Sequence, residues 1–230
     1  MIKLEDVTKT YMLGEERIVA VNNLRLTVRS GEFVAVTGES GCGKTTLLSL
    51  VGGLDRPDSG RVIVNGQDIT RLGDGELTRY RRDQVGIVFQ FFNLIPILTV
   101  SENVALPGLL QAQPGQEVLS RVEHLLTEMG LWNRRNHYPH EISGGEMQRA
   151  AIARALINQP RLILADEPTG NLDSRTGGEI LHLLSELRER HQTTVILATH
   201  SVEAASRADR RLTMRDGSLS LPGEVPEGTI

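Results

Sequence analysis

The stretch GESGCGKT, residues 38–45, decides the fold. It fits the pattern G-x-x-x-x-G-K-[ST] and lies between an apolar run typical of a strand, GEFVAVTG, and a helical stretch, KTTLLSLVGG. Glycines let backbone N–H groups curl around phosphate oxygens, and the start of a helix adds partial positive charge. Lys44 supplies a cation for the β- and γ-phosphates, and the Thr45 hydroxyl can bind Mg²⁺.

This stretch therefore predicts a nucleotide-binding loop that continues into the next helix. The alternative is a glycine-rich turn that arose by chance, and about 1% of random chains of this length match the pattern. The residues expected to bind the nucleotide are Gly38, Glu39, Ser40, Gly41, Cys42, Gly43, Lys44, Thr45 and Thr46.

A second segment, RLILADEP at 161–168, is an apolar strand that ends in two carboxylates. In a fold with a phosphate loop, Asp166 would hold Mg²⁺ through its water shell. Glu167 would face the γ-phosphate and polarise an attacking water molecule. The alternative is an acidic cap on a strand end. The position of the pair, well after the phosphate loop and before the rigid Pro168, favours the catalytic interpretation.

A third segment, ISGGEMQR at 142–149, opens a helix. Ser143 and Glu146 predict a capping box, which accounts for these two residues but not for Gly144 and Gly145 between them. Two glycines at a helix start expose backbone N–H groups and form a second anion site. Because one nucleotide cannot easily reach two loops on different lobes, we expect a homodimer in which this segment closes on the ATP of the other subunit.

Strands alternate with helices at both ends of the chain, which favours an α/β fold with a mainly parallel sheet and helices on its faces. Helices are expected at 76–84, 116–129, 143–157 and 176–190. We predict one domain over 1–230: a core with an antiparallel β part over about 1–91 and 159–217, and an inserted helical lobe over about 92–158. The Pro- and Gly-rich tail, 218–230, is expected to be loosely held.

Composition limits the function. The chain has 230 residues and a net charge of −4, which argues against a general nucleic-acid binder. No run of 18 apolar residues is present, and the start MIKLEDVTKT is not a secretory signal. The single cysteine, Cys42, permits no internal disulfide and suggests a reducing compartment. A cytoplasmic domain is expected, with any membrane role supplied by a partner.

Three of the four phenylalanines lie within four residues, in FQFFNLIPIL at 89–98. A proline-broken segment cannot easily bury so many apolar side chains at once, so part of it is expected to form an exposed patch that binds a partner. The alternative is that the segment packs inside the helical lobe. The residues predicted to dock the partner are Phe91, Phe92, Leu94 and Ile95.

Seven motifs in order carry a resemblance across nearly the whole chain: Tyr11, GESGCGKT, VFQ, ISGGEMQRAAIARAL, LILADEP, GNLD and ATH. The set resembles the ATP-binding cassette (ABC) ATPases, which have a RecA-like P-loop core. The finer pattern GGLDRPDSG, VFQFFNLIPILTVSENV and DEPTGNLD is similar to the branch that contains the macrolide-exporter MacB and lipoprotein-releasing LolD cassettes.

The resemblance implies roles for further residues. Tyr11 would stack on adenine, Gln90 would sense Mg²⁺ and water, and His200 would contact the γ-phosphate. Asp173 would bridge two subunits. The segment Ser143, Gly144, Gly145 and Glu146 would contact ATP across the dimer. Ile142, Glu146 and Ser201 depart from the usual Leu, Gln and Asp, but none of them removes a catalytic group, and Ser201 can serve as a helix N-cap.

The resemblance also implies ATP hydrolysis with Mg²⁺ at the cytoplasmic face of the inner membrane. We expect a peripheral homodimer on a membrane subunit that exports or extracts a lipid, lipoprotein or hydrophobic compound, with a periplasmic adaptor reached through that subunit. One alternative is a cell-division cassette that transmits force without transport. Another is an ABC protein acting on ribosomes or DNA, which the single cassette and the net charge of −4 disfavour.

Overall fold

The computed structural model of the chain describes residues 1–111 and 114–220. It forms two compact units, Met1–Thr78 together with the chain from Thr194 onward, and Arg79–Thr193. The strands are β1 Ile2–Leu13, β2 Glu16–Val28, β3 Phe33–Thr37, β4 Ser59–Val64, β5 Gln67–Asp68, β6 Val85–Val88, β7 Leu162–Asp166, β8 Thr194–Thr199, β9 Arg210–Arg215 and β10 Ser218–Ser220. The α-helices are α1 Lys44–Val51, α2 Asp74–Gln84, α3 Val100–Leu109, α4 Gly115–Glu128, α5 Gly144–Leu156, α6 Ser174–His191 and α7 Val202–Ser206. Three short 3-10 helices cover Ile69–Arg71, Trp132–Arg134 and Pro139–Glu141.

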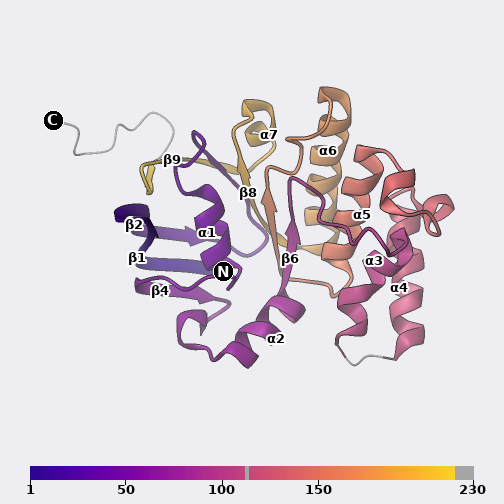
Figure 1. The fold of residues 1–230 in the computed structure, drawn as a ribbon, viewed down its shortest axis with the longest axis horizontal. Coiled ribbons are helices and arrows are strands. Elements are labelled where there is room, and N and C mark those ends of the chain that lie inside the picture. Colours follow the sequence, from indigo (N-terminus) through magenta and orange to yellow (C-terminus); the bar gives the residue numbers. More distant parts are fainter. Residues whose placement is uncertain (112–113, 221–230) are drawn as a thin grey trace. The chain divides into compact units, whose positions relative to one another are not determined.

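The first unit contains two groups of strands (Figure 1). An antiparallel sheet has the order β2-β1-β4-β5, and the second group runs β10-β9-β3-β8. The strand β3, buried from Phe33 to Val36, pairs in parallel with β8 and β9, so that Ala35 lies opposite Leu197 and Arg211. Helix α1 packs against β8 of one group and against β2 and β4 of the other. The phosphate loop therefore leaves a buried strand and enters a buried helix.

The second unit contains the parallel pair β6–β7 and the helices α3 to α6. Ile87 lies opposite Leu164 in the pair. Helix α5 packs so closely on β6 that a Cβ at Gly86 would lie 2.5 Å from the Ala155 carbonyl oxygen. Helix α6 buries one apolar stripe along its length, formed by Ile180, Leu181, Leu184 and Leu187.

The predicted helices are confirmed, as α2, α4, α5 and α6, with ends shifted by a few residues. One prediction for the tail is wrong. Ser218–Ser220 is not loose but forms β10, because the turn at Asp216 and Gly217 folds it back as an antiparallel partner of β9. The rest of the predicted tail, 221–230, lies outside the described residues. The division into a core and a helical lobe stays a prediction.

Candidate functional site

The phosphate loop begins where β3 ends and closes at the first residue of α1. Gly43, the residue before α1, has a φ of 109°. A Cβ there would lie 2.1 Å from the Ala20 carbonyl oxygen and 2.7 Å from Met214 Cε. Only glycine fits both this backbone conformation and this close approach. The second glycine of the sequence pattern is therefore fixed by packing within the first unit.

Lys44 is held inside the loop. Its side chain is buried, and the ammonium donates to the carbonyl oxygens of Gly38 at 2.8 Å and Glu39 at 2.9 Å. A lysine ammonium has three donors, and the same group also lies 3.8 Å from Cys42 Sγ, a weak acceptor that a phosphate oxygen could replace. The positive charge sits beside the N-terminus of α1, where the helix dipole also favours an anion.

A hollow of about 570 Å³ borders the loop. Gly38 to Cys42 form one wall, and Thr213 to Asp216, from β9 and the turn after it, form the other. Glu39, Ser40 and Gly41 are exposed within it. The tip of the loop is thus exposed beside this hollow.

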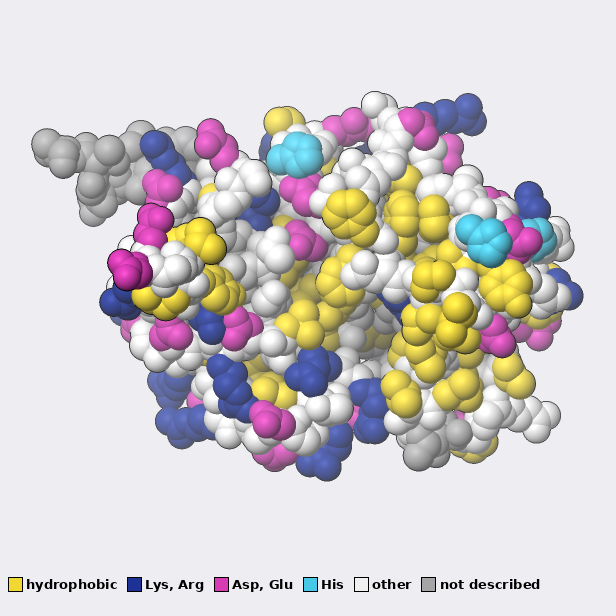
Figure 2. All heavy atoms as spheres, viewed as in Figure 1, with side chains coloured by type: hydrophobic (Ala, Val, Ile, Leu, Met, Phe, Trp, Pro, Cys, Tyr) yellow, Lys and Arg dark blue, Asp and Glu magenta, His cyan; other side chains and the backbone are white. Residues whose placement is uncertain are grey.

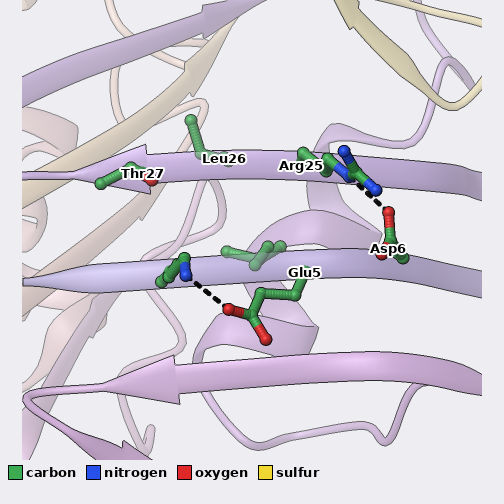
Figure 3. Close-up of a pocket in the computed structure, with 7 residues that line it drawn as sticks. Glu5, Asp6, Arg25, Leu26 and Thr27 are labelled. Atoms are coloured by element: carbon green, nitrogen blue, oxygen red, sulfur yellow. Dashed lines mark hydrogen bonds and ion pairs between the residues drawn. The ribbon is translucent and has the colours of Figure 1, made fainter.

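A second hollow of the same unit has a different character. It measures about 440 Å³ and is lined by residues of β1 and β2. Its charged side chains are paired with one another, Lys3 with Glu5 and Arg25 with Asp6, and Figure 3 shows the pair of Arg25 and Asp6. The ammonium that suits a phosphate is instead that of Lys44, the first residue of α1.

Tyr11 lies near the end of β1 with 40% of its surface exposed. Its hydroxyl donates to Asp55 Oδ2 at 2.8 Å, and the Lys9 ammonium lies 5.2 Å from the ring centroid. Partial burial, followed by the bond to Asp55, raises the pKa of the Tyr11 phenol, while a hydrogen bond with Thr46 acts in the opposite direction. The ring is therefore fixed at its tip and tied to α1, and it keeps surface on which a base can stack.

In the second unit Asp166 is the last residue of β7 and Glu167 follows it directly, and both residues are half-buried. Glu167 has a φ of 46°, in the left-handed region that non-glycine residues seldom adopt. Such a conformation costs about 1–3 kcal/mol and persists where the surroundings hold it. The Gly170 amide donates to the Glu167 carbonyl oxygen at 3.0 Å and closes this turn.

The start of α5 contains the predicted capping box. Glu146 Oε2 accepts from the Ser143 amide at 2.8 Å, and the Glu146 amide donates to Ser143 Oγ at 3.3 Å. Arg134 Nε donates to Glu146 Oε1 at 3.2 Å. The bond from the Ser143 backbone, above all, lowers the pKa of the Glu146 carboxyl, with Arg134 adding to it. Ser143 itself is exposed.

The two glycines of this segment are packed tightly. A Cβ at Gly145 would lie 2.5 Å from Thr176 Cγ2, and one at Gly144 would lie 3.3 Å from Leu172 Cδ2. Both neighbours belong to the loop after β7 and the start of α6. The glycines let that loop and the start of α6 lie directly against the start of α5.

Asp173 and His200 are both exposed. Asp173 is the N-cap of α6, and its Oδ1 accepts from the Thr176 amide at 3.1 Å. Hydrogen bonds from Thr176 lower the pKa of Asp173. His200 directly follows β8, and Ser201 after it caps α7 by accepting from the Ala204 amide at 3.1 Å, as predicted. His200 thus lies exposed at a strand end, and Asp173 lies exposed at the start of a helix.

The predicted site residues divide between the two units. Tyr11, the phosphate loop from Gly38 to Thr46, and His200 belong to the first. The second holds Gln90, Asp166, Glu167, the segment 143–146 and Asp173. Within the first unit the structure brings Tyr11 together with Thr46, and within the second it brings Gln90 against Gly170 and Asn171.

The phenylalanine segment is exposed but firmly held. Phe91 is 71% exposed and Ile95 is exposed, whereas Phe92 and Leu94 are half-buried. The buried Asn103 amide accepts from the Ile95 amide at 2.7 Å and donates to the Ile95, Leu98 and Thr99 carbonyl oxygens. Arg154 donates to the carbonyl oxygens of Phe92 and Asn93.

Figure 2 shows hydrophobic side chains gathered on one face of the second unit, around α3 and α4. Exposed apolar side chains of this unit include Phe91, Ile95, Ile97, Leu109, Leu110 and Leu119. The segment 91–98 therefore presents apolar surface on a backbone that is fixed in place.

Sequence reasoning missed several polar residues that hold the site residues. Asp55 anchors Tyr11, Arg134 pairs with Glu146, and Asn171 bonds Gln90. The buried amides of Asn103 and Gln148 are further examples. A polar residue on an otherwise apolar helix face was the available signal for Asn103, since Val100, Val104 and Ala105 around it are buried.

The side chains proposed for Mg²⁺ suit a hard cation. Thr45 offers a hydroxyl, Asp166 a carboxylate and Gln90 an amide oxygen, and Mg²⁺ prefers oxygen ligands. Over residues 1–111 and 114–220, no group of three or more His, Cys, Asp or Glu is placed to hold a metal ion. No helix in this part of the chain has the length and apolar character that crossing a bilayer requires.

Comparison with known proteins identifies the family. The family model described as ABC transporter matches residues 21–170. The chain is 48% identical to the ABC transporter ATP-binding protein MJ0796 of Methanocaldococcus jannaschii over 95% of each chain. It is 43% identical to the macrolide export ATP-binding/permease protein MacB of Brucella melitensis, over 95% of this chain and 34% of that protein.

A solved structure of the MJ0796 cassette, a dimer in a post-hydrolysis state bound to ADP and Pi, superposes with a TM-score of 0.88. The two are 44% identical, and the match covers 98% of this chain and 100% of the other. The chain therefore has the fold of the P-loop ATPase cassettes. The chain belongs to the ABC transporter family as an ATP-binding subunit, and it is an ATPase.

Proposed function

We propose that this ATPase works as a homodimer that ATP closes and hydrolysis opens, and that this cycle drives a membrane partner. The observation that carries the proposal is the start of α5. Ser143 is exposed there, and Gly144 and Gly145 add no side chain to the capping box of Ser143 and Glu146, which lets the helix start pack closely against Leu172 and Thr176. A helix start of this kind suits a phosphate from outside the unit. The dimeric form of the MJ0796 cassette supports this interpretation.

Within each subunit, we assign ATP binding to the first unit and the water-activating carboxylate to the second. Adenine stacks on Tyr11, and the phosphates lie over the loop with Lys44 beneath them. Glu167 accepts the proton of the attacking water as general base, and Gln90 and His200 orient that water. Mg²⁺, held by Thr45 and Gln90 and through water by Asp166, would offset the charge of the phosphates.

Across the dimer, Ser143, Gly145 and Glu146 would contact the ATP of the other subunit, and Asp173 would bridge the two copies. Each contact strengthens when the γ-phosphate is present. ATP can shift the equilibrium toward the closed dimer only through this difference in affinity, which cleavage of the γ-phosphate removes. Hydrolysis then lets the subunits separate.

The segment 91–98 is our candidate for docking the membrane subunit. It is supported by exposed Phe91 and Ile97 on a backbone that Asn103 and Arg154 hold. A short helix of the partner could bind such a surface through apolar contacts. We place the chain at the cytoplasmic face of the membrane, with a lipid, lipoprotein or hydrophobic compound as cargo and a periplasmic adaptor bound through the membrane subunit.

The test is copurification of a tagged chain from detergent-solubilised membranes of its own host, followed by ATPase assays of the complex. We expect a membrane-spanning subunit to copurify and to change the ATPase rate. Phe91→Ser should lose that subunit, whereas Leu119→Ser, which alters another highly exposed apolar side chain, on α4, should retain it. Equal retention by the two variants would contradict the docking site. Stimulation by ribosomes or DNA instead of the membrane subunit would contradict the proposed function.

A further inference from the structure

We infer that Asn171 and Gly170 are positioning residues that hold Gln90 for hydrolysis. The inference rests on the proposed role of Gln90. The Asn171 side-chain amide donates to the Gln90 backbone oxygen at 2.9 Å, and the Gln90 side-chain amide approaches Asn171 Oδ1 at 3.5 Å. These residues are 81 positions apart in the sequence. These bonds join the residue just before the segment 91–98, our docking candidate, to the residues that follow Glu167.

Gly170 sets the other side of this contact. A Cβ at Gly170 would lie 2.8 Å from Gln90 Nε2 and 3.1 Å from its Cδ. A real Cβ does not approach a nitrogen so closely, so any larger residue at 170 would push the Gln90 amide aside. Because Gly170 has no side chain, the Gln90 amide can occupy this space.

A second set of hydrogen bonds links the same two segments at Phe89 and Pro168. Gln148, on α5, is fully buried, and its side-chain amide donates to the Pro168 carbonyl oxygen at 2.7 Å. The same amide lies 3.4 Å from the Phe89 carbonyl oxygen. One donor therefore spans the residue before Gln90 and the residue after Glu167. Gln148 holds the backbone of the two segments, whereas Asn171 and Gly170 determine where the Gln90 side chain lies.

This arrangement gives the docking segment a route to the catalytic carboxylate. Gln90 precedes Phe91 directly, and the turn from Glu167 to Gly170 is closed by the Gly170 amide. Movement of the segment 91–95 would pull on Gln90 and, through Asn171, on that turn. Asn171 and Gly170 would then affect the rate of hydrolysis rather than the affinity for ATP, because neither belongs to the phosphate loop.

The experiment measures kcat and KM for Mg-ATP in the full chain for Asn171→Ala, Asn171→Asp and Gly170→Ala. Asn171→Asp keeps the shape of the side chain but replaces the donor with a second acceptor. We expect kcat to fall about 3- to 10-fold for the Asn171 variants and about 10-fold for Gly170→Ala, with KM within about twofold. Arg175→Ala, an exposed change four residues beyond Asn171, is the matched control and should leave both constants unchanged.

Double variants separate positioning from a general effect on the loop. In a Gln90→Ala background, Asn171→Ala and Gly170→Ala should each change kcat by less than about twofold, because the side chain they position is gone. Additive losses in that background, an Asn171→Asp variant equal to wild type, or equal changes in KM and kcat would overturn the inference. If Gln90→Ala itself leaves kcat unchanged, the proposed role of Gln90 has failed. If only the positioning variants leave kcat unchanged, that role stands and the inference alone has failed.

Discussion

Replacing Gly43 with alanine tests whether the phosphate loop is fixed by close packing. The added Cβ would lie 2.1 Å from the Ala20 carbonyl oxygen and 2.7 Å from Met214 Cε, at a φ of 109°. The backbone conformation costs about 1–3 kcal/mol for a residue with a side chain. The overlap adds about 1–3 kcal/mol, because β2 and β9 must move to relieve it. The free energy of unfolding should therefore fall by about 2–6 kcal/mol.

Gly41→Ala is the matched control. Gly41 has a φ of 82°, but a Cβ there would meet nothing within 4 Å. This variant should lose only the conformational part, about 1–3 kcal/mol. Urea unfolding without nucleotide, followed by circular dichroism, measures both variants. If Gly43→Ala is no less stable than Gly41→Ala, then the close approach of Ala20 and Met214 is not the reason that position 43 requires glycine.

Two further predictions concern side chains at the site. Tyr11→Ala should weaken ATP binding about 2- to 10-fold, whereas Tyr11→Phe should bind ATP nearly as well as wild type, because stacking needs the ring and not the hydroxyl. A titration with a fluorescent nucleotide measures both affinities, and equal losses in the two variants would refute this. Because the pKa of Glu146 lies below its ordinary 4.5, its stabilising effect is present above that value and is lost as pH falls through the lowered pKa. Glu146→Gln should therefore be less stable at pH 7 and lose less stability than wild type between pH 6 and pH 3; parallel unfolding curves would contradict this.

Local patterns in the sequence predicted much of the fold. The α5 capping box needs residues three apart, and it forms as expected between Ser143 and Glu146. The phosphate loop was predicted for the same reason, since its glycines, lysine and flanking strand and helix are contiguous. The strand β10 was missed because Pro and Gly dominate the tail, while its pairing depends on the turn at Asp216 and Gly217.

The contacts that hold the site residues were beyond such patterns. Asp55 meets Tyr11 across 44 positions, and Arg154 meets Phe92 across 62. A polar side chain that bonds a distant backbone oxygen leaves no periodic signal, because its partner is chosen by packing of the whole unit. Asn171 illustrates this, since nothing in GNLD indicates that its amide bonds Gln90. Sequence reasoning thus led to proposals for the reacting groups but not for the residues that position them.

The most direct test of the central claim is the oligomeric state of Glu167→Gln, measured by size-exclusion chromatography with light scattering. With the general base removed and the nucleotide contacts intact, the account predicts a stable dimer at saturating ATP and a monomer with ADP. The double variant Lys44→Ala and Glu167→Gln, which lacks the phosphate-binding ammonium, should stay monomeric. A Glu167→Gln chain that remains a monomer at saturating ATP would contradict the proposal that ATP joins two copies.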